Sequence, residues 1–281
     1  MSISKAVLIT GCSSGIGWAT AKRLSKVGFR VYATARNIEK IAPLEECGCR
    51  LLALDVTDED SMRLAVEEVE REEGAVGALV NNAGYSQSGA VEAVPMKKVR
   101  AQFETNVFGL VRMCQLVLPG MRRQGYGRIV NVSSMGGKLT FPGAGYYHAT
   151  KHAVEAISDA LRFEVEGFGI KVSVIEPGLI RTGFADTAVG SMDGQQDGHY
   201  AGFDEAVARA TTENYERGPL SKLGGEPEAV AEAIEQALSA RNPRSRYAVT
   251  PSAHLFLGLR RLLPDGVWDA VLKSSYPQPG R

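Results

Sequence analysis

Three side chains near the middle of the sequence have the types and the spacing of a proton-transfer site. Tyr147 and Lys151 are four residues apart, so on a helix both side chains project from the same face. A nearby ammonium favours the phenolate, so we expect Lys151 to lower the pKa of Tyr147. Ser134 stands thirteen residues before Tyr147 and would hydrogen-bond a substrate oxygen. The set predicts general acid/base chemistry by Tyr147 on a carbonyl or an alcohol.

Each member of this set also has a purely structural explanation. A tyrosine and a lysine four residues apart are common on a helix face, and either Ser133 or Ser134 could cap a loop. The catalytic interpretation depends on the residues occurring together in one arrangement. Two histidines flank the motif, His148 and His152, but helical spacing directs them away from the Tyr147 face. We therefore interpret both as structural or exposed.

A glycine-rich turn near the N-terminus is typical of dinucleotide binding. Residues 10–17 read TGCSSGIG and lie between an apolar run that predicts a strand and a helical pattern. Gly11 allows a tight exit from the strand, Gly15 leaves room for a pyrophosphate, and Gly17 permits close contact between helix and sheet. Free N–H groups at the helix N-terminus would bind the phosphates. The alternative is an ordinary glycine-rich loop. The predicted binding residues of the turn are Gly11, Ser13, Ser14, Gly15, Ile16 and Gly17.

The end of the second predicted strand bears on which nicotinamide cofactor is bound. An acid there would bind the ribose 2′-hydroxyl of NAD, whereas an arginine suits the 2′-phosphate of NADP. The strand ends at Ala35 and Arg36, and no acid precedes Glu39. Arg36 offers a planar set of donors to a phosphate, and Ser14 would add a hydroxyl. We predict NADP(H), with NAD(H) less favoured; the alternative for Arg36 is a solvated loop charge.

Strand and helix patterns alternate through the first 176 residues. This alternation predicts an α/β fold with a doubly wound parallel sheet and helices on both faces, a single-domain Rossmann fold. We expect residues 1–281 to form one dinucleotide-binding catalytic domain. The predicted strands cover residues 6–10, 29–35, 50–54, 78–81, 128–132 and 171–176, and the predicted helices cover 16–26, 58–73, 101–124 and 146–166.

The pattern changes after residue 177. Residues 183–202 are rich in Gly, Asp, Gln and Ser, which predicts a mobile irregular segment, and helical patterns follow at 203–215 and 227–240. We expect residues 183–218 to form a substrate lid, 246–250 a final edge strand, and 251–281 a C-terminal extension. The apolar residues of the lid include Phe184, Val189, Met192, Tyr200 and Phe203. Together with Leu139 and Phe141 they would enclose a bulky apolar alcohol or ketone; the alternative is that they pack within the lid.

Taken together, these motifs resemble the short-chain dehydrogenase/reductase family. The resemblance spans residues 4–182 and rests on the turn at 10–17, the Asn-Asn-Ala-Gly run at 81–84, the Ser-Tyr-Lys set, and the Pro-Gly pair at 177–178. The turn, together with Val31-Tyr-Ala-Thr-Ala-Arg36, is most similar to the branch of 17β-hydroxysteroid and related retinol dehydrogenases. This branch suggests steroid-like, retinoid-like or polyketide-like substrates.

The resemblance implies further contacts. Lys151 would hold the nicotinamide ribose, an oxidised nicotinamide would further lower the pKa of Tyr147, and Asn106 would hold a water that links the lysine to solvent. Asp55 also has an interpretation as a loop acid, and Asn81 as a structural residue.

The family likeness also implies a homodimer or homotetramer through the helices that carry Asn106 and Tyr147. The remaining implied cofactor residues form the adenine pocket, the ribose wall and the nicotinamide clamp: Asp55 and Val56; Asn82, Ala83 and Gly84; Pro177, Gly178, Ile180 and Thr182.

The helices of this implied interface carry four apolar residues that are either interface or core: Leu110, Met113, Ala156 and Leu161.

The composition of the chain counts against several other classes of function. The 32 Lys plus Arg balance the 32 Asp plus Glu, so nothing attracts nucleic acid or an anionic membrane. The four cysteines have no zinc-like spacing, and we predict reduced thiols and no metal. The start of the chain is too short for a signal peptide, and no apolar run has a spanning length, so we expect a cytoplasmic protein without a transmembrane segment.

The predicted function is an NADP(H)-dependent oxidoreductase that interconverts a ketone or aldehyde and a secondary or primary alcohol on a bulky apolar substrate. Two alternatives remain. One is a regulatory or sensor protein that binds NADP(H) with little turnover. The other is a β-ketoacyl reductase, against which the C-terminal extension counts.

Overall fold

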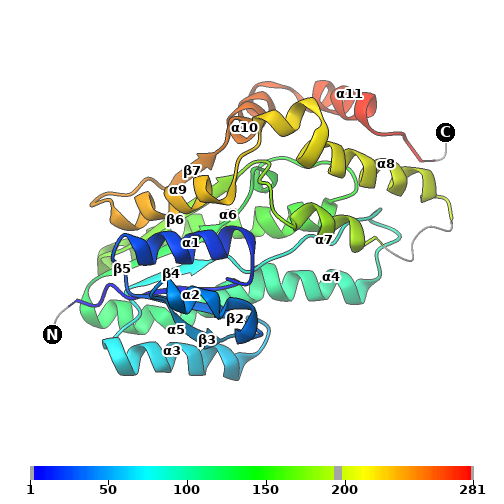
Figure 1. The fold of residues 1–281 in the computed structure, drawn as a ribbon. Coiled ribbons are helices and arrows are strands. Elements are labelled where there is room, and N and C mark those ends of the chain that lie inside the picture. The colour runs from blue at the N-terminus through cyan, green and yellow to red at the C-terminus, as the bar shows by residue number, and fades with distance from the viewer. Residues whose placement is uncertain (1–2, 193–197, 280–281) are drawn as a thin grey trace.

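A seven-stranded parallel sheet forms the centre of the computed structural model, which describes residues 3–192 and 198–279 (Figure 1). The strand order is β3-β2-β1-β4-β5-β6-β7, so the chain leaves β1 in one direction and continues from β4 in the other. Such a switch point between neighbouring strands opens a crevice at their carboxyl ends. The strands are β1 Val7–Ile9, β2 Val31–Ala35, β3 Arg50–Ala53, β4 Ala78–Asn81, β5 Gly127–Val132, β6 Ile170–Pro177 and β7 Arg246–Val249.

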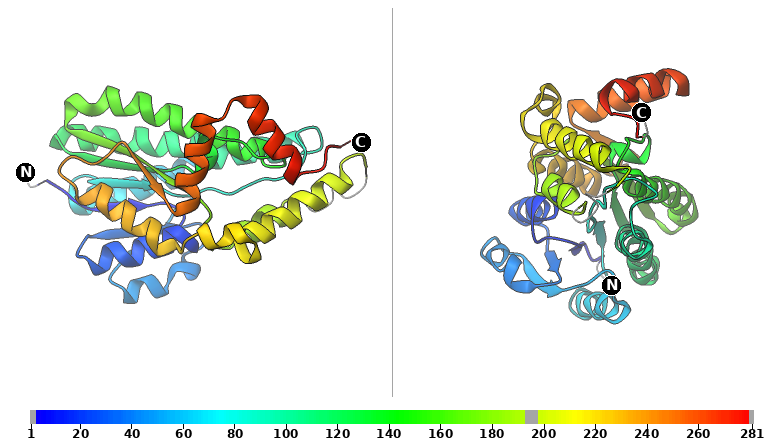
Figure 2. Two further views of the ribbon diagram at one scale, coloured as in Figure 1. Left: turned by 90° about the horizontal axis from the view of Figure 1, so that it is seen from above. Right: turned by 90° about the vertical axis from the view of Figure 1, so that its right-hand side faces the viewer.

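Helices cover both faces of the sheet. Figure 1 shows α1 (Gly15–Lys26) and α9 (Pro227–Ser239) on one side, and α3 (Glu59–Glu73) and α5 (Gly109–Gln124) on the other. The end-on view in the right panel of Figure 2 shows the sheet between these layers. α6 (Gly145–Val165) lies on the α3 and α5 side, because its Val154 belongs to the same buried cluster as Met113 of α5. The predicted doubly wound fold is confirmed.

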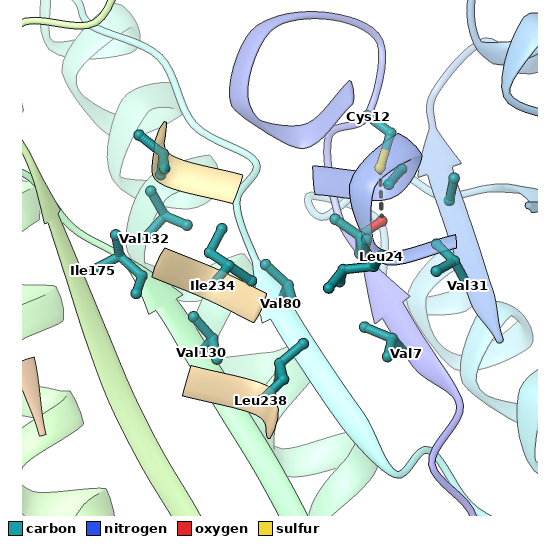
Figure 3. Close-up of a cluster of buried hydrophobic side chains, with 14 of the residues drawn as sticks. Val7, Cys12, Leu24, Val31, Val80, Val130, Val132, Ile175, Ile234 and Leu238 are labelled. Atoms are coloured by element: carbon teal, nitrogen blue, oxygen red, sulfur yellow. Dashed lines mark hydrogen bonds between the residues drawn. The ribbon is translucent and has the colours of Figure 1, made fainter. Parts of the chain in front are cut away.

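Two apolar cores follow from the alternation of side chains along the strands. Val7 and Ile9 face α1 and α9, whereas Leu8 between them faces α3 and α5. Figure 3 shows the first core, where Leu24 of α1 and Ile234 of α9 meet the strand side chains. Strands buried on both faces explain why the sequence shows continuous apolar runs there.

The helix ends follow local signals. Asp58 caps α3 by accepting a hydrogen bond from the backbone N–H of Ser61, and Gly74 ends the helix with a φ of 83°. The stretch predicted as one helix at 101–124 begins earlier, as α4 (Met96–Phe103), and reaches α5 through a π-helical turn, η2 (Glu104–Phe108). A second π-helical turn, η5 (Glu213–Arg217), follows α8 (Ala201–Thr212).

The prediction of an irregular segment at 183–202 is wrong in part. Residues Phe184–Gly190 form α7, and α8 begins at Ala201; residues 193–197 lie outside the described part of the chain. The polar composition concealed α7, which is held by tertiary contacts: Ala185 and Ala188 are buried, and Ser191 accepts a 2.8 Å hydrogen bond from the backbone N–H of Ser88.

The C-terminal part completes the fold. The predicted strand at 246–250 is β7, which pairs in parallel with β6 at the sheet edge. Two helices follow, α10 (Pro251–Leu262) and α11 (Asp265–Ser275), separated at Pro264. No helix within the described ranges is long and apolar enough to cross a bilayer. The short elements are α2 Pro43–Glu46 and the 3₁₀ turns η1 Ile38–Ile41, η3 Met135–Gly137, η4 Glu166–Phe168 and η6 Pro219–Leu223.

Candidate active site

A cavity of about 870 Å³ opens at the carboxyl ends of five strands, where the strand order switches. Gly11 follows β1, Arg36 follows β2, Asn82 follows β4, Ser133 follows β5 and Gly178 follows β6, and all five line the cavity. Open α/β sheets bind ligands at this position. Of the predicted site residues, all but Gly17 and Asn106 line it: Gly11, Ser13, Ser14, Gly15, Ile16, Arg36, Asp55, Val56, Asn82, Ala83, Gly84, Ser134, Tyr147, Lys151, Pro177, Gly178, Ile180 and Thr182.

The glycine-rich turn has the geometry that a pyrophosphate needs. Gly11 and Gly15 have positive φ values of 75° and 56°, which favour glycine. A Cβ on Gly17 would overlap the Gly11 carbonyl oxygen and lie 2.5 Å from the amide nitrogen of Asn82. Gly17 therefore lies behind the turn and allows the start of α1 to pack closely against Gly11 and Asn82. The Ser14 side chain does not cap α1, which leaves the first N–H groups of the helix available to an anion.

Asn82 holds the turn in this shape. Its side-chain N–H group donates 3.0 Å hydrogen bonds to the carbonyl oxygens of Thr10 and Gly11. The Thr10 hydroxyl in turn accepts from the backbone N–H groups of Asn82 and Ala83. These bonds couple the ends of β1 and β4 at the switch point. The residues present fit a dinucleotide, because the turn combines close backbone, unsatisfied N–H groups and a rigid support.

Arg36 stands exposed at the rim of the cavity. Burial raises the pKa of Tyr85, and the Arg36 guanidinium partly offsets that rise, which places the two side chains near each other. In the ranges 3–192 and 198–279, Arg36 takes part in no ion pair. Its donors are therefore available to a ligand.

Asp55 lies in the loop that follows β3. It lines the cavity, and its carboxylate also accepts hydrogen bonds of 2.9 and 2.8 Å from the backbone N–H and the hydroxyl of Thr57. The second contact is the loop-acid arrangement that the sequence also allowed.

Ser134, Tyr147 and Lys151 come together at the inner end of the cavity. Ser134 begins η3, and its hydroxyl accepts a 3.0 Å hydrogen bond from the backbone N–H of Gly136. Tyr147 and Lys151 project from the same face of α6, with the lysine nitrogen 5.8 Å from the centre of the tyrosine ring. Lys151 is buried and donates a 2.8 Å hydrogen bond to the carbonyl oxygen of Val132. A serine hydroxyl, a phenol and an ammonium thus share one space.

The expectation that Lys151 lowers the pKa of Tyr147 is wrong for the protein by itself. Burial raises the pKa of Tyr147 to about 12, and the Ser134 hydroxyl offsets only part of that rise. The Phe184 ring lies 5.3 Å from the Tyr147 ring, and both rings line the cavity. Burial also lowers the pKa of Lys151 to about 8, which Glu155 partly opposes. Desolvation therefore outweighs the attraction between ammonium and phenolate.

Asn106 lies behind the cavity wall. Its carbonyl oxygen accepts from the backbone N–H of Tyr85, and its side-chain N–H group donates to the Tyr85 carbonyl oxygen at 2.9 Å and to the Thr150 hydroxyl at 3.1 Å. A Cβ on Gly84 would lie 3.1 Å from Asn106 and 3.7 Å from the Lys151 nitrogen. Asn106 thus satisfies backbone groups close to Lys151. The water link stays a prediction.

Several other residues that the sequence singled out lie outside the cavity lining. Asn81 is buried and donates to the side-chain oxygen of Asn131 at 3.0 Å, which supports its structural interpretation. His148 is buried, 3.1 Å from the carbonyl oxygen of Gly136, and His152 is exposed. Leu110 and Met113 belong to the core, whereas Ala156 is exposed and Leu161 partly buried. Assembly through this face stays a prediction.

The loop after β6 closes the cavity over the turn. A Cβ on Gly15 would lie 3.1 Å from the Thr182 methyl group, so the two segments touch. A Cβ on Gly178 would overlap the Ser252 hydroxyl oxygen and lie 2.5 Å from the Thr250 hydroxyl oxygen. Among the described non-glycine residues, Thr250 alone has a positive φ, 88°. The start of α10 therefore packs against the predicted nicotinamide clamp.

Most of the predicted apolar substrate wall does not reach the cavity. Phe184 lines it, but Leu139 and Met192 are buried elsewhere, and Phe141 packs against Phe256 and Trp268. The Tyr200 hydroxyl donates to Glu92 outside the cavity. The lining residues that sequence reasoning did not single out include Tyr85, Thr187 and Tyr215. Tyr215 fell inside the expected lid, but its spacing gave no signal that set it apart.

Comparison with known proteins adds a family context. A family model described as short chain dehydrogenase matches residues 5–192. The chain is 39% identical to a 3-ketodihydrosphingosine reductase of Bacteroides thetaiotaomicron, over 96% of this chain and 97% of that protein. It is 35% identical to an NADPH-dependent 3-dehydrocapnine reductase of Ornithobacterium rhinotracheale, over 94% of each protein.

The expected branch has a match as well. The chain is 37% identical to estradiol 17-beta-dehydrogenase 1 of Rattus norvegicus, over 92% of this chain and 76% of that protein. A solved short-chain dehydrogenase from Streptomyces avermitilis superimposes with a TM-score of 0.76 at 33% identity, covering 96% of this chain and 95% of that one.

Proposed function

Because the chain belongs to the short-chain dehydrogenase family and is an oxidoreductase, we propose that it interconverts a carbonyl and an alcohol on a bulky apolar substrate with NADP(H). One observation carries this proposal. Ser134, Tyr147 and Lys151 line the same cavity as the glycine-rich turn and Arg36. A site that only sensed the dinucleotide would not need Ser134 and Tyr147.

The proton chemistry follows from the ionisation of two side chains. With a pKa of about 12, Tyr147 is a phenol at neutral pH and has a proton to donate to a carbonyl oxygen. The Ser134 hydroxyl would hydrogen-bond the same oxygen. Lys151, with a pKa of about 8, is mostly an ammonium at neutral pH and would stabilise the phenolate that remains. When bound, the reduced nicotinamide supplies the hydride for the carbonyl carbon. A protonated Tyr147 favours reduction.

The cofactor proposal rests on Arg36. The N–H groups of the turn would hold the pyrophosphate, and Arg36 with Ser14 would hold a 2′-phosphate. Asp55 and Val56 would line the adenine pocket, while Lys151 would bind the nicotinamide ribose. The NADPH dependence of the 3-dehydrocapnine reductase supports this choice.

The substrate proposal rests on the wall beyond Tyr147. Phe184 and Tyr215 supply aromatic surface there, 6.0 Å apart between ring centres. The 3-ketodihydrosphingosine and estradiol in the names of two relatives guide the choice of test compounds. We propose a carbonyl on an apolar chain or ring system.

A ketone panel with both cofactors tests the function. NADPH consumption is followed near 340 nm, where reduced nicotinamide absorbs, with 3-ketodihydrosphingosine among the ketones; estradiol is tested in the oxidative direction. We expect turnover with NADPH and a loss of about 10²- to 10⁴-fold in kcat for Tyr147→Phe, with NADPH binding retained. The matched control is Tyr146→Phe, whose hydroxyl bonds the Val91 carbonyl oxygen outside the cavity.

Retention of most of the kcat by Tyr147→Phe would exclude the assigned role of that residue. NADPH binding without turnover across the panel would instead favour a sensor.

A further inference from the structure

Tyr215 is a second phenol at the inner end of the cavity. Its ring is 6.0 Å from Phe184, which is in turn 5.3 Å from Tyr147, so the two tyrosines flank one phenylalanine. Burial raises the pKa of Tyr215, and the nearby Tyr147 raises it further. The two hydroxyl groups therefore lie in the same part of the cavity, and Tyr215 stays protonated at neutral pH as a hydrogen-bond donor.

The ring of Tyr215 is anchored, but its hydroxyl is not. The ring packs against an apolar cluster of Met135, Leu179 and Ala253, together with Phe256 of α10. Among residues 3–192 and 198–279, no group forms a hydrogen bond with the Tyr215 hydroxyl. A fixed ring with an unused donor beside the reacting position has the properties of a ligand-binding group.

The backbone supports the same interpretation. Tyr215 lies in the π-helical turn η5, and Asn106 lies in the π-helical turn η2. Single π turns occur frequently at functional sites. η2 places the Asn106 amide near Lys151, and η5, at the end of α8, places the Tyr215 ring against Phe184.

From this geometry we propose that Tyr215 is a specificity-determining residue that donates a hydrogen bond to an uncharged polar group of the substrate close to the reacting carbonyl. Phe184 and the Tyr215 ring then hold the apolar body on either side. The substrate class is a ketone with a hydroxyl or second carbonyl oxygen near its carbonyl, on a bulky apolar frame. This inference rests on the proposed function, because it assumes that Ser134 and Tyr147 bind the reacting oxygen.

A matched pair of ketones tests the hydrogen bond. Benzoin and deoxybenzoin have the same two rings and the same carbonyl, and only benzoin has a hydroxyl on the adjacent carbon. The dissociation constants of both for the complex with NADPH, and kcat/KM where turnover occurs, are measured for the wild type and Tyr215→Phe. One neutral hydrogen bond corresponds to roughly three- to tenfold in affinity. We expect the wild type to prefer benzoin by this factor and Tyr215→Phe to lose the preference.

Tyr200→Phe is the matched control. Tyr200 directly precedes the same helix, α8, but its hydroxyl donates to Glu92 at the molecular surface. This variant should keep the preference for benzoin, and all three proteins should bind NADPH equally. A wild type without the preference, or a Tyr215→Phe variant that keeps it or loses affinity for both ketones equally, would overturn the proposal. Failure of the wild type to turn over any ketone would instead count against the proposed function.

Discussion

Replacing Arg36 by leucine tests the cofactor assignment most directly. Arg36 is exposed and has no ion-pair partner among the described residues, so its loss should leave the fold intact. Hydrogen bonds to charged groups contribute roughly 1.5–3 kcal/mol, and solvent screening places Arg36 near the lower limit. Since 1.4 kcal/mol corresponds to a factor of ten, kcat/KM for NADPH should fall about tenfold. The value for NADH should change by less than about twofold, because NADH has no 2′-phosphate.

The assay compares initial rates with both cofactors at low and high salt. Arg36→Lys is the control, because it keeps the charge without the planar donors and should retain part of the preference. Adding Ala35→Asp to Arg36→Leu supplies an acceptor for the ribose 2′-hydroxyl and should shift the preference toward NAD. An NADPH/NADH ratio of kcat/KM that is the same in the wild type and the double variant would refute this reasoning.

Two other predictions concern stability. The pKa of Lys151 in the folded protein, about 8, lies below the ordinary lysine value of 10.5. Between these two values the folded state therefore binds fewer protons than the unfolded state, and the free energy of unfolding rises with pH. Lys151→Met removes this pH dependence, so its free energy of unfolding should exceed that of the wild type most at neutral pH. In urea unfolding the difference should shrink by up to about 3 kcal/mol as the pH approaches 10.5. A difference that does not change with pH would contradict this. Gly17→Ala should lower stability by about 1–3 kcal/mol and weaken NADPH binding, because the new methyl group overlaps the Gly11 carbonyl oxygen. The control is Gly258→Ala in α10, where a new Cβ would meet open space. In thermal melting this variant should be as stable as the wild type or more stable.

Local signals in the sequence were sufficient for most of the scaffold. β4 has the predicted bounds, Ala78–Asn81, because a buried parallel strand needs a short, continuous apolar run. The glycine-rich turn and the Tyr147–Lys151 pair also depend on spacing within one or two elements. Such features can be recognised without knowledge of the tertiary structure.

The features that were missed depend on contacts between distant segments. Burial raises the pKa of Tyr147, and the segments packed around it include Phe184, which lies far along the chain. α7 packs on the body of the protein through Ala185 and Ala188, and the Gly-rich, polar composition of the surrounding residues 183–202 does not reveal this. Tyr215 reaches the cavity through a π-helical turn, and apolar periodicity assumes a regular helix.

The π-helical turn η2 also makes helix length a determinant of the site, because it joins α4 directly to α5. A π turn is an α-helical turn with one additional residue, and each residue turns an α-helix by about 100°. Removing one residue from η2 would leave one continuous α-helix of ordinary composition, yet the side chains after the deletion would rotate relative to those before it. Two chains of this fold that differ by a single deletion could therefore share all of their catalytic residues and still present different walls to a substrate.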